Sequence, residues 1–270
     1  MRKSVRFKGV EVSYADRGAG SCIMLLHGYL ETAEIWEDYV PLLSERFRVI
    51  SVDLAGHGWS GCWGNEHSMD DLATSLKIIL DAEGIHKLVL VGHSMGGYVT
   101  LAFAALFPER LDGYVLFHST CFADTDEKKA NRDREISLVL CGRKRQIISL
   151  NIPKAFAETN VEKLKEKVIR AQEIAYQNDD RGIVALLKGM KNRSDLSSTL
   201  SDSAIPLMLI GGMKDNYIPM TVFEKLGVMA PHATVLKLAQ SGHMGFVEEA
   251  DRSAEALMEF SLKASRPIQD

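Results

Sequence analysis

The sequence lacks the features of several large classes of protein. No apolar run approaches the length of about 18 residues that a membrane-spanning helix requires. The four cysteines, Cys22, Cys62, Cys121 and Cys141, show no C-x-x-C spacing, which argues against a zinc site or a disulfide framework. A basic excess is also missing, because 32 Lys and Arg residues face 36 Asp and Glu residues. We therefore expect a protein that binds neither membranes nor nucleic acids.

The composition is otherwise that of an ordinary globular protein. The chain has 270 residues, of which 46% are hydrophobic and 25% are charged. A chain of this length buries a large core without disulfides or metals to stabilise it. The N-terminal residues are charged and no apolar segment follows them, so we expect no secretory signal, reduced cysteines and a cytoplasmic location.

Short apolar segments alternate with helical patterns along most of the chain. We expect strands at residues 10–14, 22–26, 47–54, 87–92, 111–117, 205–211 and 234–238. Apolar residues at helical spacing predict helices at 36–43, 69–80, 95–107, 220–228 and 246–261. This order predicts an α/β fold, with a mostly parallel sheet covered by helices on both faces.

The alternation stops between residues 120 and 202. No convincing strand pattern occurs there, whereas residues 161–175 and 183–190 have helical spacing. We interpret 120–202 as a helical cap inserted into one core domain formed by 1–119 and 203–270. The basic excess within this segment has two interpretations, a solvated charged surface, which we prefer, and the attraction of an anionic substrate.

Gly92-His93-Ser94-Met95-Gly96 matches the pattern G-x-S-x-G at the junction of a predicted strand and helix. A sharp turn at this junction strains the central residue, and the flanking glycines allow the strand and helix to pack closely. The turn lifts the Ser94 hydroxyl to the carboxyl end of the sheet, where ligands bind in open α/β folds. Ser94 is therefore the candidate nucleophile.

A serine nucleophile needs a base and a carboxylate at the same edge of the sheet. His243 follows the last predicted strand, and Asp215 follows the strand before it. The chain order Ser94, Asp215, His243 predicts a catalytic triad. Backbone N–H groups of Met95 and of Tyr29, which follows the strand at 22–26, are the candidate oxyanion donors.

Three further residues are candidates for the substrate pocket. His118 ends a predicted strand, and Phe122 and Phe156 lie in the predicted cap. The alternative for the two phenylalanines is packing of the cap against the sheet. Residues 56–61 also match G-x-G-x-x-G, but no helix begins at the third glycine, so we expect no dinucleotide cofactor.

Together these motifs resemble the α/β-hydrolase superfamily, and the resemblance covers nearly the whole chain. Leu26-His27-Gly28 resembles its oxyanion motif, and the segment from Asp53 to Ser60 resembles its D-x-x-G-x-G-x-S loop. The family carries a helical lid where 120–202 interrupts the sheet pattern. In the haloalkane dehalogenases and epoxide hydrolases of this family, an Asp occupies the position of Ser94. The serine at this position therefore disfavours both activities.

The resemblance implies a serine hydrolase of small carboxylic esters that uses no metal or cofactor and is a monomer or homodimer. Two alternatives remain open. One is a carbon–carbon bond hydrolase or a lyase of the same fold, and the other is a slow-turnover ligand receptor. The identity of the substrate does not follow from these motifs.

Overall fold

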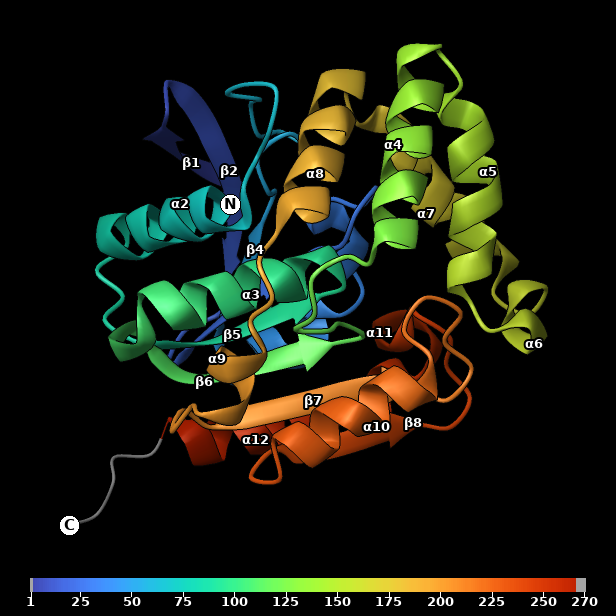
Figure 1. Cartoon of the computed structure of the whole chain (residues 1–270). Helices are drawn as coiled ribbons and strands as arrows, with labels where there is room; N and C mark the ends of the chain where they lie inside the picture. The colour runs from blue at the N-terminus through green and yellow to red at the C-terminus, as the bar shows by residue number, and fades with distance from the viewer. Residues whose placement is uncertain (1, 266–270) are drawn as a thin grey trace.

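A single twisted sheet organises the computed structural model, which describes residues 2–265. Within this range the sheet has eight strands in the order β1-β2-β4-β3-β5-β6-β7-β8 (Figure 1). Strand β2 pairs antiparallel with β1 and β4, and all other pairs are parallel. The strands are β1 (Arg2–Phe7), β2 (Val10–Arg17), β3 (Cys22–Leu26), β4 (Arg48–Val52), β5 (Leu88–His93), β6 (Leu111–Phe117), β7 (Leu207–Gly212) and β8 (Thr234–Leu238).

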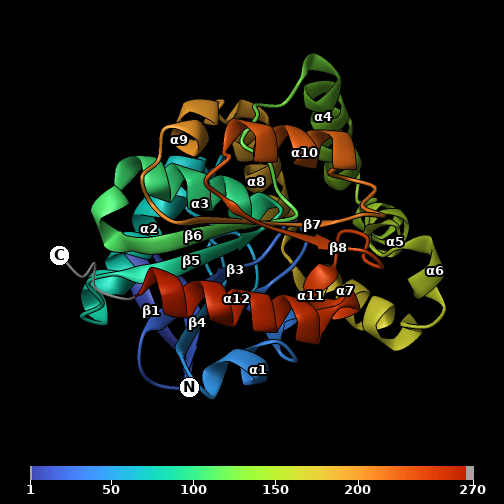
Figure 2. The ribbon, with the colours of Figure 1, turned by 90° about the horizontal axis from the view of Figure 1, so that it is seen from below.

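Helices cover both faces of the sheet, as Figure 2 shows. Helices α2, α3 and α10 pack on one face, and α1 and α12 pack on the other. The bounds of these helices are α1 (Val40–Ser44), α2 (Met69–Ala82), α3 (Met95–Leu106), α10 (Met220–Met229) and α12 (Ala250–Ala264). This arrangement confirms the predicted α/β fold class.

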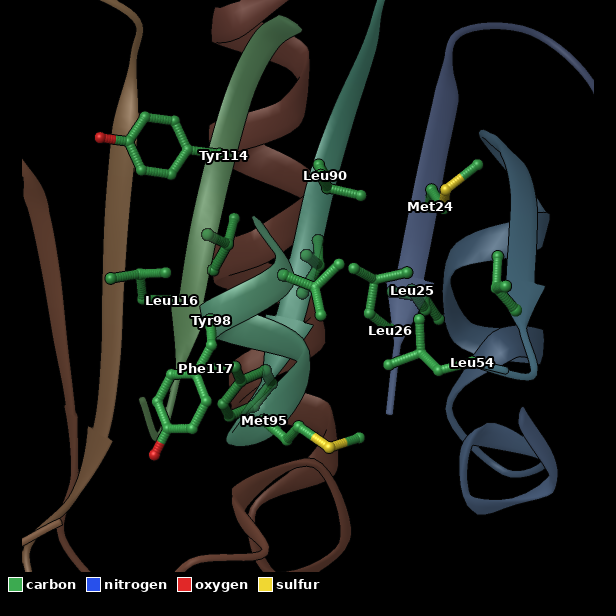
Figure 3. Close-up of a cluster of buried hydrophobic side chains, with 14 of the residues drawn as sticks. Met24, Leu25, Leu26, Leu54, Leu90, Met95, Tyr98, Tyr114, Leu116 and Phe117 are labelled. Atoms are coloured by element: carbon green, nitrogen blue, oxygen red, sulfur yellow. The ribbon is translucent and has the colours of Figure 1, made fainter. Parts of the chain in front are cut away.

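The core is densest along the central parallel strands. Every residue of β3 and β5 is buried, as expected for strands that are covered on both faces. Leu25 of β3 and Leu90 of β5 belong to one cluster of buried side chains that also contains Met95 of α3 and Phe117 of β6 (Figure 3). The turn that carries Ser94 therefore directly follows one of the fully buried strands.

Helices replace strands between β6 and β7, in the segment that contains the predicted cap. They are α4 (Asp126–Leu140), α5 (Lys144–Ala155), α6 (Glu158–Val161), α7 (Lys165–Gln177), α8 (Asp180–Asn192) and α9 (Ser197–Ser201). Helices α4, α5 and α7 stand beyond the ends of the strands, at the right of Figures 1 and 2. None of the helices over residues 2–265 has the length and apolar character to cross a membrane.

The structure also departs from the predicted elements. The helix expected at 36–43 is instead the 3-10 helix η1 (Ala33–Trp36) followed by the short α1. The helix expected at 246–261 is split into α11 (Gly245–Glu248) and α12. Pro41 lies at the beginning of α1, where the fixed backbone angle of proline suits the first turn of a helix.

Candidate active site

Ser94 lies between the end of β5 and the beginning of α3. Its φ of 49° places a non-glycine residue in the left-handed region, which is a strained conformation. A Cβ on Gly92 would collide with the carbonyl oxygen of Gly96, and a Cβ on Gly96 would collide with that of Leu26, so both positions need glycine. This tight turn places the Ser94 side chain at the carboxyl edge of the sheet.

His243 and Asp215 form a buried pair at the same edge. The Nδ1 atom of His243 lies 2.8 Å from Oδ2 of Asp215, and the His243 residue is only 6% exposed. Within the described residues, no hydrogen bond joins the Ser94 hydroxyl to His243, although both residues line the same cavity. Catalytic hydrogen bonds are often long before substrate binds, so this geometry is compatible with a triad.

His118 contacts the same carboxylate from the other side. Its Nδ1 atom lies 3.0 Å from Oδ2 of Asp215, and its Nε2 atom accepts the Gly245 N–H at 3.2 Å. Burial lowers the pKa of His118 to about 4, which leaves the ring neutral at pH 7. A neutral ring that donates from Nδ1 to Asp215 and accepts at Nε2 from Gly245 fits these two contacts, and the Gly212 N–H also approaches Nδ1 at 3.2 Å. His118 thus supports the orientation of Asp215.

All the lone-pair positions of Asp215 are occupied. Oδ2 accepts from the two imidazoles, and Oδ1 accepts the backbone N–H groups of Tyr217 and Ile218 at 2.7 and 2.9 Å. Burial opposes a charge on Asp215, but the two imidazoles outweigh it and hold the pKa of Asp215 below its ordinary value. The three side chains have ligand atoms within 4.8 Å of one another. Hydrogen bonds account for this cluster without a metal ion.

The backbone of His243 is fixed by two other parts of the molecule. Its N–H donates to the carbonyl of Ala155 at the end of α5, at 2.6 Å. Its carbonyl lies 2.9 Å from Nε2 of His93. A Cβ on the preceding Gly242 would meet the backbone of Phe156 and Ala157, so this loop packs directly against the segment between α5 and α6.

The loop after β3 carries the first candidate oxyanion donor, Tyr29. Its conformation is held by the Leu30 N–H, which donates to Nε2 of His57, and by the Ala33 N–H, which donates to Oδ1 of Asp53. The D-x-x-G-x-G-x-S segment therefore holds the loop that carries Tyr29. The second candidate donor, Met95, is the first residue of α3, where the amide N–H has no carbonyl partner within the helix.

A second histidine–carboxylate pair lies beneath this loop and was not predicted from the sequence. Nδ1 of His93 lies 2.9 Å from Oε2 of Glu31, which also accepts the Gly28 N–H at 2.5 Å. Both side chains are buried. Nε2 of His93 faces a carbonyl, so it must carry a proton, and a second proton must lie between Nδ1 and the carboxylate. Burial opposes the charged forms, but the mutual attraction raises the pKa of His93 and lowers that of Glu31.

A cavity of about 500 Å³ lies between these residues and the helices that follow β6. Ser94, His243 and Tyr29 line one side of it, and Arg132 and Glu135 of α4 also line it. The predicted substrate contacts lie elsewhere. His118 is fully buried behind Asp215, Phe122 packs beside Lys225, and Phe156 lies behind the His243 loop. None of these three is among the residues that line the cavity.

The family model for the alpha/beta hydrolase fold matches residues 22–250. The chain belongs to this family. One relative of this hydrolase-fold chain is the pimeloyl-[acyl-carrier protein] methyl ester esterase of Yersinia enterocolitica, at 26% identity over 92% of the chain and 96% of the relative. Another is the 2-hydroxy-6-oxononadienedioate/2-hydroxy-6-oxononatrienedioate hydrolase of Paraburkholderia phymatum, at 28% identity over 93% of the chain and 91% of the relative.

A third relative is the dihydrolipoyllysine-residue acetyltransferase component of an acetoin cleaving system from Pseudomonas putida. It is 28% identical over 90% of the chain, which spans only 64% of that protein. Among solved structures, a thermophilic esterase from Thermogutta terrifontis with malate bound has a TM-score of 0.94 and 27% identity, covering 98% of this chain and 100% of that chain. The relatives named as esterases and hydrolases support a hydrolase enzyme for this member of the alpha/beta hydrolase fold family.

Proposed function

We propose that this protein hydrolyses carboxylic esters of small molecules through an acyl-enzyme formed on Ser94. The observation that carries the proposal is the buried contact of 2.8 Å between His243 and Asp215, beside a cavity that both Ser94 and His243 line. A base oriented by a carboxylate activates a serine hydroxyl in this manner. The similarity to esterases adds support for the same reaction.

In the first half of the reaction, the Ser94 oxygen attacks the ester carbonyl carbon and its proton moves to Nε2 of His243. Asp215 stabilises the imidazolium that results. The oxyanion accepts hydrogen bonds from the N–H groups of Tyr29 and Met95. The bond to the alkoxy group then breaks, and His243 returns the proton to the departing alcohol.

In the second half, His243 removes a proton from a water molecule that attacks the acyl-enzyme. The tetrahedral intermediate collapses to release the carboxylic acid and the Ser94 hydroxyl. We also propose that residues 120–202 act as a cap over the core formed by 1–119 and 203–270. A cap that encloses the cavity restricts which substrates enter and excludes water from the reacting atoms.

The proposal is tested with Ser94→Ala on a short-chain acyl ester. We expect kcat to fall by about 10⁴- to 10⁶-fold, because the variant has no nucleophile. A fluorophosphonate probe followed by mass spectrometry of the labelled peptide should modify Ser94 in the unchanged protein. Retention of most of the esterase rate in the variant contradicts the proposal.

The second candidate function is hydrolysis of a carbon–carbon bond. It is favoured by the similarity to the Paraburkholderia phymatum hydrolase, which covers nearly the whole of both proteins. A panel of simple esters and dienoic keto acids distinguishes the two reactions. A much higher kcat/KM for the keto acids assigns carbon–carbon hydrolysis.

A further inference from the structure

The cap end of the cavity contains hydrogen-bond donors that the proposed triad does not use. The hydroxyl of Tyr29 is buried and has no hydrogen-bond partner within the described residues. Buried polar atoms are nearly always paired, so such a hydroxyl calls for a ligand or a water. Tyr29 and Arg132 line the same cavity as Ser94.

Arg132 is held in place by only one edge of its guanidinium. Its Nε atom donates to Oδ2 of Asp124 at 3.1 Å, and the side chain is 19% exposed. In the described part of the chain, its two terminal nitrogens make no hydrogen bond to protein. A guanidinium with its outer edge free is suited to bind a carboxylate through two parallel hydrogen bonds.

The local charge also favours an anion. Asp124 is shared, because Arg193 approaches its other oxygen, Oδ1, at 2.7 Å. Two guanidinium groups therefore face one buried carboxylate, which leaves one positive charge uncompensated among these three side chains. Glu135, the acidic neighbour on α4, accepts a hydrogen bond from Asn151, and burial raises its pKa. Within residues 2–265, no hydrogen bond or ion pair joins Glu135 to Arg132, whose only such partner is Asp124.

We propose that Arg132 and the Tyr29 hydroxyl form a carboxylate subsite, so that the preferred substrates are esters that carry a free carboxylate remote from the ester group. This inference rests on the proposed ester hydrolysis. It names the class of substrate for the same cavity. The carboxylate lies against α4, while the ester group reaches Ser94.

The test compares two esters of similar shape, monomethyl adipate and methyl hexanoate. For the unchanged protein we expect kcat/KM to be at least about tenfold higher for monomethyl adipate, since only this ester forms charge-assisted hydrogen bonds to Arg132. In Arg132→Gln the ratio of the two values should fall by about tenfold or more, mainly through KM. In Tyr29→Phe, which keeps the backbone N–H, the ratio should fall by a smaller factor.

Arg143→Gln is the matched control. Arg143 is an exposed cap residue outside the cavity lining, and its replacement removes the same charge. Its ratio should stay within about twofold of the unchanged protein, because an exposed charge is screened. Equal ratios for the unchanged protein and Arg132→Gln, or an equal fall in Arg143→Gln, overturn the subsite.

A binding measurement separates this proposal from the proposed function. Calorimetric titration of hexanoate and hexanamide needs no turnover, and only hexanoate should bind more weakly to Arg132→Gln. If hexanoate shows this dependence but no ester is hydrolysed, the subsite stands and ester hydrolysis fails. If esters are hydrolysed and hexanoate binding is indifferent to Arg132→Gln, the subsite fails alone.

Discussion

Two histidine–carboxylate pairs lie close to Ser94, and they differ in what the second ring nitrogen does. In both pairs Nδ1 contacts a buried carboxylate, at 2.8 Å for His243 with Asp215 and 2.9 Å for His93 with Glu31. Nε2 of His93 is occupied by the carbonyl of His243. Nε2 of His243 has no hydrogen-bond partner within residues 2–265, although both histidines line the cavity.

This difference is the reason for proposing His243 as the base and for assigning His93 a structural role. A ring with a free second nitrogen can accept a proton, whereas a ring with both nitrogens donating cannot. The His93 pair instead links three segments, namely the oxyanion loop through Gly28, the strand before Ser94 and the loop of His243. Burial and a carboxylate partner alone do not identify a catalytic histidine.

The largest expected effect comes from replacing the free ring. His243→Gln should lower kcat/KM on a short-chain ester by about 10⁴-fold, because no group remains to accept the Ser94 proton. His93→Gln should lower it far less per folded molecule while reducing stability more. Steady-state kinetics on both variants, with thermal unfolding as the control for folding, measures this contrast. Equal losses of activity would remove the distinction between the pairs.

The next effect tests the His93 pair through its carboxylate. Glu31→Gln leaves a buried imidazolium without a counter-charge, and we expect a loss of about 3 kcal/mol in the free energy of unfolding near pH 6. The raised pKa of His93 contributes stability below its ordinary pKa that is lost as the pH rises through the folded value. The cost of Glu31→Gln should therefore be smaller at pH 9 than at pH 6. Urea unfolding at both pH values measures it.

The third prediction concerns His118, whose protonation should have a smaller effect on stability than Glu31→Gln. The pKa of His118 is lowered from 6.5 to about 4, so the unfolded state binds more protons in this window and acid destabilises the fold. The shift corresponds to a loss of about 2 kcal/mol between pH 7 and pH 5. His118→Asn should flatten this part of the stability profile, whereas replacing the exposed His232 should leave it unchanged. Asparagine also tolerates the positive φ of 51° at this position.

The smallest expected effect comes from an exposed ion pair, which serves as a reference for the buried Glu31–His93 pair. Lys237 and Glu224 form an ion pair of 2.9 Å in which both side chains are about half exposed. Glu224→Gln should change the free energy of unfolding by less than about 1 kcal/mol, because solvent screens the pair. A cost as large as that of Glu31→Gln would show that burial is not the source of the larger effect. The same urea unfolding experiment makes the comparison.

Much of the core could be predicted because its strands are short, apolar and separated by clear helical spacing. β3 and β5 are buried on both faces and leave a continuous apolar signal. β1 was missed because it is an edge strand rich in charge, with an alternating half-exposed pattern. In α4 only Val139 is buried, so the helix that carries Arg132 has almost no apolar period to detect.

The candidate triad was accessible from sequence because each member follows a strand, and the carboxyl ends of parallel strands meet at one edge. The Glu31–His93 pair was not accessible, since 62 residues separate its members and no local pattern marks them. His118 was assigned to the pocket wall because it ends a strand. Its positive φ and its contact with Asp215 turn it behind the site instead.

The backbone of His243 is hydrogen-bonded to Ala155 at the end of α5 on one side and to His93 at the end of β5 on the other. The residue that we propose as the base is therefore attached both to the helices between β6 and β7 and to the sheet. A displacement of the C-terminal end of α5 that is large enough to widen the entrance of the cavity must either break the hydrogen bond between Ala155 and His243 or move the His243 imidazole with it. On the proposed function, opening of the proposed cap and the position of the proposed base are therefore linked, and a structure with α5 displaced outward should show the His243 ring moved away from Ser94.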